Sequence, residues 1–303
     1  MADLSVTMAG VTFRNPIIPA SGAFGFGQEY QCLYPLSRLG GISLKGTTLH
    51  ARQGNPPPRI AETPAGMLNS VGLQNPGVDQ LIAQELPKLK EQGTVIIANI
   101  AGATVEEYAE AVRRLEETPV HMIELNISCP NVKQGGAAFG VNPETAAEVT
   151  RAVRRVTTKP LMIKLSPNVT DITLIAKAVE AEGADAISLI NTLLGMRIDV
   201  RTRRPILHQN VGGLSGPAVL PIAVRMVWQT AQAVKIPICG MGGVSRWEDA
   251  LELILAGAST VQIGAALFAN PMAPLEIIQG LSQYLDEHHI PQLADLIGAV
   301  EPY

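Results

Sequence analysis

The stretch "TVIIANIAGATVEEYAEAVRRLEETPVHMIELNIS", residues 94–128, holds one complete strand–helix–strand unit. Residues 94–102 and 121–128 are nearly continuous apolar runs, which are typical of parallel strands buried on both faces. Between them, Thr104 and Glu107 have the spacing of a capping box, and the apolar residues that follow share one stripe of a helix. The stretch therefore predicts two parallel strands joined by a helix.

The same alternation continues along the chain. Six further strands are predicted at 15–22, 41–48, 160–167, 184–192, 236–243 and 260–267. Further helix starts are predicted at Ser245 with Glu248, and at Asn142 before Pro143. Eight strand–helix units in 303 residues predict a single α/β domain, a (β/α)8 TIM barrel over residues 1–303. An open doubly wound sheet is the alternative.

Segments outside this repeat predict additions to the barrel. Residues 4–15 predict a hairpin with its turn at Gly10, which could plug the N-terminal end of the barrel. Residues 49–77 and 193–216 are too long for plain connections. We expect long loops after the second, fourth and sixth strands, on the face where barrel active sites form.

Composition narrows the class of protein. The net charge is −4 with no basic tract, and aromatic residues make up 4%, so nucleic-acid binding has little support. Three cysteines, Cys32, Cys129 and Cys239, are too few for a disulfide framework and suit a reducing setting. The start lacks signal-peptide features, and no apolar run reaches about 18 residues. We therefore expect a cytoplasmic protein without a membrane segment.

The ends of the predicted strands share a chemistry of amides, two lysines, one thiol and glycines, with almost no carboxylate. Glycines 240, 242, 243 and 264, with Ala265, could present backbone N–H groups to a phosphate, although they could also simply form tight turns. Lys45 and Lys164 lie in apolar strands, where an unpaired charge is costly, so we expect each to meet an anion or an electron-rich ring. A Schiff-base role for Lys164 in a non-redox phosphate-binding barrel is an alternative.

Other cofactor chemistry finds little support. The five histidines form no helical i, i+4 pair, and the chain has no CxxC motif. An iron–sulfur cluster needs about four thiolates, so no metal site is predicted. "GFGQEY" (25–30) begins like a dinucleotide fingerprint but lacks its last glycine and its setting. Cys32 and Cys239 are expected to be small buried side chains.

Four motifs carry a resemblance to a known family: "ASGAFGFGQEY" (20–30), "NSVGLQNPG" (69–77), "ELNISCPNVKQGGAAFG" (124–140) and "NTLLGM" (191–196). With them, the chain resembles the catalytic subunits of class 1B dihydroorotate dehydrogenases over essentially its whole length. Such an enzyme oxidises (S)-dihydroorotate to orotate in de novo pyrimidine (UMP) biosynthesis. A fumarate-dependent class 1A enzyme and a dihydropyrimidine dehydrogenase-like FMN barrel are the nearest alternatives.

The resemblance implies FMN and substrate positions in this chain. Cys129 would be the general base, taking a proton from C5 while C6 passes hydride to the flavin. The FMN positions would be Ser21, Lys45, Gly46, Asn99, Asn126, Lys164, Ile190, Gly216, Gly242, Gly243, Gly264 and Ala265. The substrate positions would be Lys45, Asn69, Ser70, Val71, Gly72, Leu73, Asn126, Asn191 and Thr192.

The resemblance also implies a route for the electrons. A partner subunit carrying FAD and a [2Fe–2S] cluster would pass them to NAD⁺. The chain would then form a homodimer within a heterotetramer.

Overall fold

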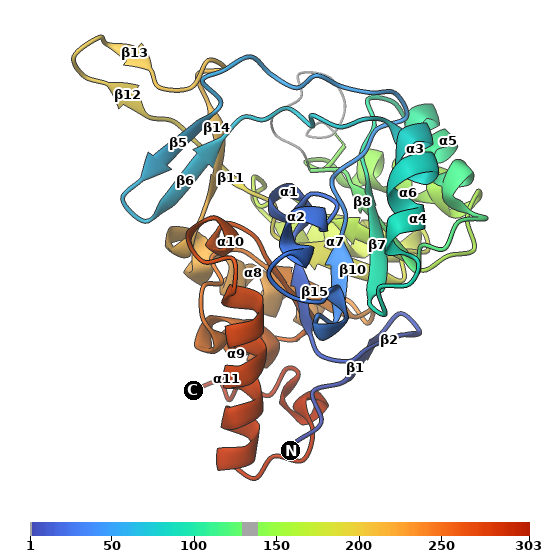
Figure 1. Ribbon diagram of the computed structural model, residues 1–303, viewed down its shortest axis with the longest axis vertical. Coiled ribbons are helices and arrows are strands. Elements are labelled where there is room, and N and C mark those ends of the chain that lie inside the picture. Colours follow the sequence, from blue (N-terminus) through green and yellow to red (C-terminus); the bar gives the residue numbers. More distant parts are fainter. Residues whose placement is uncertain (1, 129–138) are drawn as a thin grey trace.

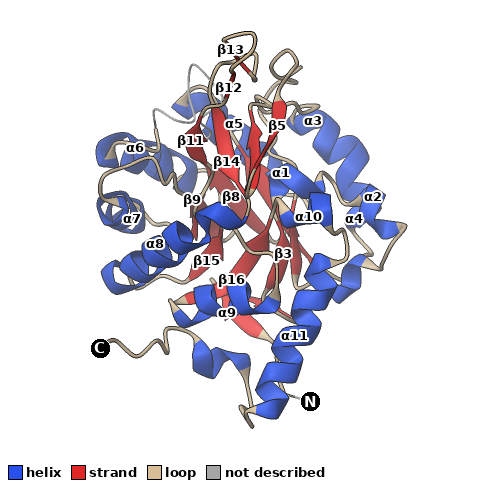
Figure 2. Cartoon of the chain, turned by 90° about the vertical axis from the view of Figure 1, so that its left-hand side faces the viewer, coloured by secondary structure: helices blue, strands red, loops and turns tan. Residues whose placement is uncertain are grey.

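The computed structural model describes residues 2–128 and 139–303, and its centre is a sheet of eight parallel strands. The predicted TIM barrel is confirmed (Figure 2), because each predicted strand range contains or overlaps one strand of this sheet. In spatial order the strands are β4 (Gly41–Ser43), β7 (Val95–Ile100), β8 (Met122–Asn126), β9 (Leu161–Lys164), β10 (Ala186–Leu189), β15 (Ile238–Met241), β16 (Ala258–Ile263) and β3 (Ile17–Pro19). The Gly40 N–H donates to the Ile17 carbonyl at 3.1 Å, which joins the two ends of the sheet.

Helices follow the strands and cover the outside of the barrel (Figure 2), so both faces of every strand are buried. The longer ones are α5 (Val105–Leu115), α6 (Pro143–Arg154), α7 (Ile172–Ala181), α8 (Leu220–Ala233), α9 (Trp247–Leu255) and α11 (Ala273–Glu287). The shorter ones are α1 (Ser21–Phe24), α2 (Gln28–Gln31), η1 (Leu36–Arg38), α3 (Val78–Gln80), η2 (Leu81–Glu85), α4 (Leu86–Leu89), η3 (Pro217–Val219), α10 (Ala266–Ala269) and η4 (Leu293–Leu296). Within the described part of the chain, no helix has the length and apolar character needed to cross a bilayer.

Two of the three predicted helix starts are confirmed. The Thr104 hydroxyl accepts from the Glu107 N–H, and the Asn142 side chain accepts from the N–H groups of Glu144 and Thr145. The prediction at Ser245 and Glu248 is wrong by one residue. Asp249 is the carboxylate that reaches back, accepting from the N–H groups of Ser245 and Arg246.

The predicted N-terminal hairpin is confirmed as β1 (Val6–Met8) paired antiparallel with β2 (Val11–Phe13). Met8 and Phe13 are fully buried, and the Thr260 hydroxyl on β16 donates to the Met8 sulfur at 3.4 Å. The hairpin therefore packs against the barrel, at the end opposite the second sheet described next (Figure 1).

The expectation of long loops after the second and sixth strands needs correction, because both segments contain strands that pair with each other. The order is β11 (Leu193–Gly195), β14 (Gly212–Ser215), β6 (Gly66–Asn69) and β5 (Ile60–Thr63), all antiparallel. We call this sheet the roof sheet, since it lies over the barrel mouth (Figure 1). A small hairpin, β12 (Ile198–Asp199) and β13 (Arg204–Pro205), extends beyond it. Sequence periodicity missed this pairing because it joins segments about 140 residues apart.

Candidate active site

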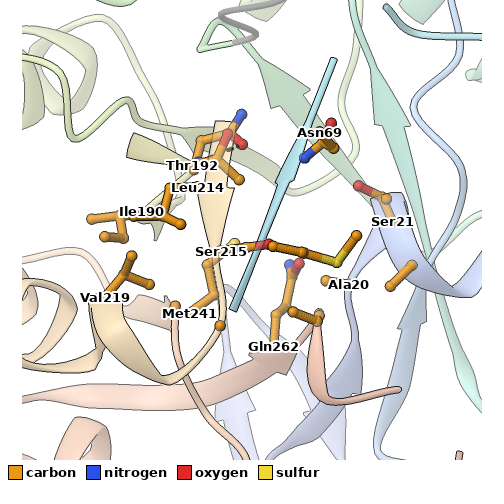
Figure 3. A pocket seen from close by; sticks show the side chains of 18 of the residues that line it. Ala20, Ser21, Asn69, Ile190, Thr192, Leu214, Ser215, Val219, Met241 and Gln262 are labelled. Atoms are coloured by element: carbon orange, nitrogen blue, oxygen red, sulfur yellow. Dashed lines mark hydrogen bonds between the residues drawn. The ribbon is translucent and has the colours of Figure 1, made fainter. Parts of the chain in front are cut away.

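A cavity of about 390 Å³ lies at the C-terminal ends of the barrel strands, under the roof sheet. Its walls come from the ends of β3, β4, β8, β9, β10, β15 and β16, together with β5, β6 and β14. Figure 3 shows Asn69 and Thr192 on the roof side, and Met241 and Gln262 on the barrel side. The volume and the mixture of apolar walls with a few polar groups are those of a small-molecule site.

The cavity brings most of the predicted site residues together. Those that line it are Ser21, Lys45, Gly46, Asn69, Val71, Gly72, Leu73, Asn126, Lys164, Ile190, Asn191, Thr192, Gly216, Gly242, Gly243, Gly264 and Ala265. Asn99, Ser70 and the predicted phosphate-site residue Gly240 do not line it. Cys129 lies outside the described residues. The convergence shows that these residues share one cavity, while their individual roles stay predictions.

Three polar side chains at the ends of β8 and β10 hold one another. The Asn191 amide donates to the Ser128 hydroxyl at 2.7 Å and to the Asn126 amide oxygen at 3.3 Å. The Ser128 hydroxyl donates to the same Asn126 oxygen at 3.0 Å. Tyr108 on α5, fully buried, donates to the Asn126 carbonyl at 2.8 Å. The backbone that leads into residue 129 is therefore fixed directly beside the cavity.

Asn99 lies one layer behind the cavity wall. Its amide nitrogen donates to the Glu124 carboxylate, and its amide oxygen is buried without a hydrogen-bond partner among the described residues. A Cβ added to Gly46, which lines the cavity, would come within 2.9 Å of that oxygen. Because Gly46 has no side chain, an acceptor lies close under the cavity surface, and buried acceptors normally have a donor.

Glu124 is the main residue that sequence reasoning missed. Its carboxylate is fully buried in the barrel and accepts hydrogen bonds from four other strands at 2.5–2.8 Å. We call this group the floor network: Ser43, Asn99, Glu124, Ser188 and Gln262. Burial alone would raise the pKa of Glu124, but the charge of Lys164 and the donated hydrogen bonds together lower it, so the carboxylate is ionised.

A signal for Glu124 was available in the sequence. A lone charge in the apolar run "HMIELNIS" is as unusual as the two strand lysines. Glu124 is two residues before Asn126, so the alternation of a strand places both on the inner face of the barrel. The anion expected for Lys164 is supplied at least in part by this carboxylate.

Lys164 itself lines the cavity and is 6% exposed. Among the described residues, it makes no hydrogen bond or ion pair within contact distance. Its ammonium therefore has donors available for a group in the cavity.

Glycines open the wall on the side of β14 and β15. Gly216 and Gly243 have positive φ angles of 107° and 83°, a region that side chains disfavour. A Cβ on Gly243 would lie 2.6 Å from the Leu220 nitrogen. Gly243 therefore allows this turn to pack against the start of α8, and the backbone of both glycines forms part of the cavity wall, which suits a phosphate.

The remaining thiols show no sign of reactivity at this site. Cys239 is buried as expected, and burial raises the pKa of its thiol to about 12. The expectation that Cys32 is buried is wrong, because it lies exposed at the end of α2. Over the described ranges, no group of three or more His, Cys, Asp or Glu side chains could hold a metal ion.

Comparison with known proteins identifies a matching family and several similar proteins. The family model "Dihydroorotate dehydrogenase" matches residues 3–285. A protein from Parabacteroides distasonis is 56% identical over 302 residues, covering 99% of both chains. Proteins from Anoxybacillus flavithermus and Bacteroides thetaiotaomicron are 56% and 54% identical, covering 98–99% of this chain and 96–100% of theirs. All three relatives are named dihydroorotate dehydrogenase B (NAD(+)), catalytic subunit.

Proposed function

This chain belongs to the dihydroorotate dehydrogenase family, and we propose that it oxidises (S)-dihydroorotate to orotate with NAD⁺ as the final acceptor. The step belongs to pyrimidine biosynthesis. The observation that supports it best is the cavity, which gathers residues from three motifs far apart in the sequence, around Asn69, Asn126 and Asn191. Overall, dihydroorotate and NAD⁺ give orotate, NADH and a proton.

The residues of the cavity fit FMN. Lys164 lines the cavity and offers a donor, and the Asn99 amide oxygen under Gly46, which has no partner among the described residues, offers an acceptor for a planar ring edged with N–H and carbonyl groups. Gly216, Gly242, Gly243, Gly264 and Ala265 would hold the phosphate with backbone N–H groups. Ser21, Lys45, Gly46, Asn126 and Ile190 complete the proposed set. When bound, FMN supplies the acceptor for the hydride that leaves C6 of the substrate.

The substrate would lie against the asparagines. Asn69, Asn126 and Asn191 each carry an amide that both donates and accepts, which matches a ring with alternating N–H and C=O groups. Lys45, Thr192 and the segment Val71–Leu73 line the same cavity, and Ser70 directly precedes that segment. Cys129 would act as general base for the C5 proton. It directly follows Ser128, which the two asparagines at the ends of β8 and β10 hold beside the cavity.

A partner subunit would complete the electron path. The relatives are named as catalytic subunits, which implies that they work with another subunit. We propose a partner that carries FAD and a [2Fe–2S] cluster and reduces NAD⁺, with two copies of this chain in a heterotetramer.

Anaerobic mixing tests the proposal. The purified chain should carry FMN, and dihydroorotate should bleach the flavin absorbance, with NAD⁺ reduced once the partner subunit is added. Absence of bleaching contradicts the proposed activity. Fumarate-supported turnover by the isolated chain would instead favour the fumarate-linked class.

Cys129→Ser tests the base in the same experiment. Loss of a general base lowers rates about 10²- to 10⁴-fold, and flavin reduction should fall by that much. In the wild type the rate should rise toward alkaline pH, because a free thiol titrates near pH ~8.5. A variant that keeps more than about a tenth of the wild-type rate contradicts the role of Cys129.

A further inference from the structure

The floor network gathers charge at a point that the proposed chemistry does not use. Glu124 on β8 accepts from Ser43 on β4, Asn99 on β7, Ser188 on β10 and Gln262 on β16. Lys164 on β9 adds the positive charge that acts on it. Six of the eight barrel strands therefore contribute one side chain each to the same buried spot.

The carboxylate dictates how the two amides point. An ionised carboxylate only accepts, so Gln262 and Asn99 must each turn their NH₂ group toward Glu124. Both amide oxygens then point away, and both are buried without a hydrogen-bond partner in the part of the chain that the structure describes. Gln262 lines the cavity (Figure 3), and the Asn99 oxygen lies under Gly46. Glu124 thus sets the orientation of two polar groups at the cavity floor without lining it.

The same carboxylate places a negative charge under the cavity. In a buried setting, charges interact more strongly than in water, and few counter-ions screen them. Lys164 lines the cavity, and the opposite charge of Glu124 lies below it and acts on it. The pair leaves the cavity floor close to neutral, whereas Lys164 alone would make it cationic.

We infer that Glu124 is a positioning residue that sets the reduction potential of bound FMN, by offsetting the charge of Lys164 and fixing the amides of Gln262 and Asn99. The inference rests on the proposed flavin function. Reduced FMN carries more negative charge than oxidised FMN, so a carboxylate under the site disfavours the reduced form. Removing that charge should raise the potential.

Holoenzyme carrying Glu124→Gln tests this through the midpoint potential of its flavin, measured by equilibration with reference dyes. We expect reduced FMN to gain about tenfold in affinity relative to oxidised FMN, which is a rise of about 30 mV for two electrons. Glu85→Gln is the matched control. Glu85 is 9% exposed, forms hydrogen bonds with Gln28 and Lys88 and does not line the cavity. The flavin potential of this variant should therefore equal that of the wild type.

Ser188→Ala supplies a second arm if Glu124→Gln does not retain FMN. It removes one donor but keeps the charge, so the less compensated carboxylate should lower the potential, by about 15 mV for a threefold change. A structural role alone would weaken binding of both flavin forms without these opposite shifts. An unchanged or lowered potential in Glu124→Gln, or an unchanged or raised one in Ser188→Ala, overturns the inference. Failure of the wild type to bind FMN would overturn the proposed function instead.

Discussion

The floor network and the roof sheet enclose the same cavity but are built in different ways. Every member of the floor network is completely buried and comes from a parallel strand of the barrel. The roof sheet is made of strands from two long insertions and is more open, with Ile60 and Leu194 on its two edge strands more than half exposed.

The floor network and the roof sheet should therefore tolerate substitutions to different degrees. In the floor, each polar group depends on the others, because a buried donor or acceptor without a partner costs about 1–3 kcal/mol. In the roof, side chains on the edge strands are largely exposed, so a single change there disturbs fewer packed neighbours. Changes in the floor should therefore alter flavin binding, whereas changes in the roof should alter substrate binding or have little effect.

The largest expected effect is in the floor. Lys164→Met removes a cation that lines the cavity, and a hydrogen bond to a charged group contributes about 1.5–3 kcal/mol. The affinity of the apoprotein for FMN should fall about 10- to 150-fold, measured by titration of flavin fluorescence. Thermal unfolding of the same sample separates lost binding from lost folding. An affinity within threefold of the wild type would remove Lys164 from the flavin site.

A roof glycine should give the next largest effect. A Cβ on Gly213 of β14 would lie 2.0 Å from the Thr192 hydroxyl, so Gly213→Ala must displace Thr192. Overpacking of this kind costs about 1–3 kcal/mol, measurable by urea unfolding. The apparent affinity for dihydroorotate should fall, while FMN affinity stays at the wild-type value.

Gly195→Ala on the neighbouring strand β11 is the matched control for Gly213→Ala. Its added Cβ would meet the end of the Leu68 side chain at 3.1 Å, and that side chain can move aside. Equal losses in the two variants would show that the contact with Thr192 is not the cause.

Lowering the pH should reduce the stability of the fold through protonation of Glu124, with a smaller effect than the two substitutions above. The folded-state pKa of Glu124 lies below its ordinary value of 4.5, so the unfolded chain binds the proton more readily. This contribution is fully present above the unfolded pKa and is lost as pH falls through the folded one. One proton changes the folding equilibrium at most about tenfold per pH unit. Unfolding curves below pH 5 should be less steeply pH-dependent in Glu124→Gln than in the wild type, and parallel curves would contradict the shift.

The smallest effect is expected on the exposed edge strand β11 of the roof. Leu194 is 53% exposed and does not line the cavity, so Leu194→Thr keeps a strand-compatible residue and removes little buried surface. The free energy of unfolding should change by less than about 0.5 kcal/mol. FMN and dihydroorotate affinities should match the wild type. A larger loss of either affinity would show that this edge strand is coupled to the cavity.

How much of each region the sequence predicts depends on how far apart along the chain the interacting residues lie. The eight strands and the helix starts at Thr104 and Asn142 depend on local patterns of apolar and capping residues, and they are confirmed. The start near Ser245 was misplaced by one residue, because Glu248 and Asp249 both offer a carboxylate at almost the same distance along the chain. The roof sheet was missed, because Asn69 and Gly213 pair across about 140 residues and no local pattern records that.

By itself, the sequence determined the order of the barrel strands and which polar residues end them. Parallel strands buried on both faces must be apolar, so any polar residue at their ends stands out. The tertiary structure alone decided what those residues do to one another. Glu124 becomes a shared acceptor for four donors because closing the barrel brings strands far apart in the sequence around one point. A buried charge is tolerated at that point because its partners arrive from every side, and a one-dimensional pattern cannot show where they meet.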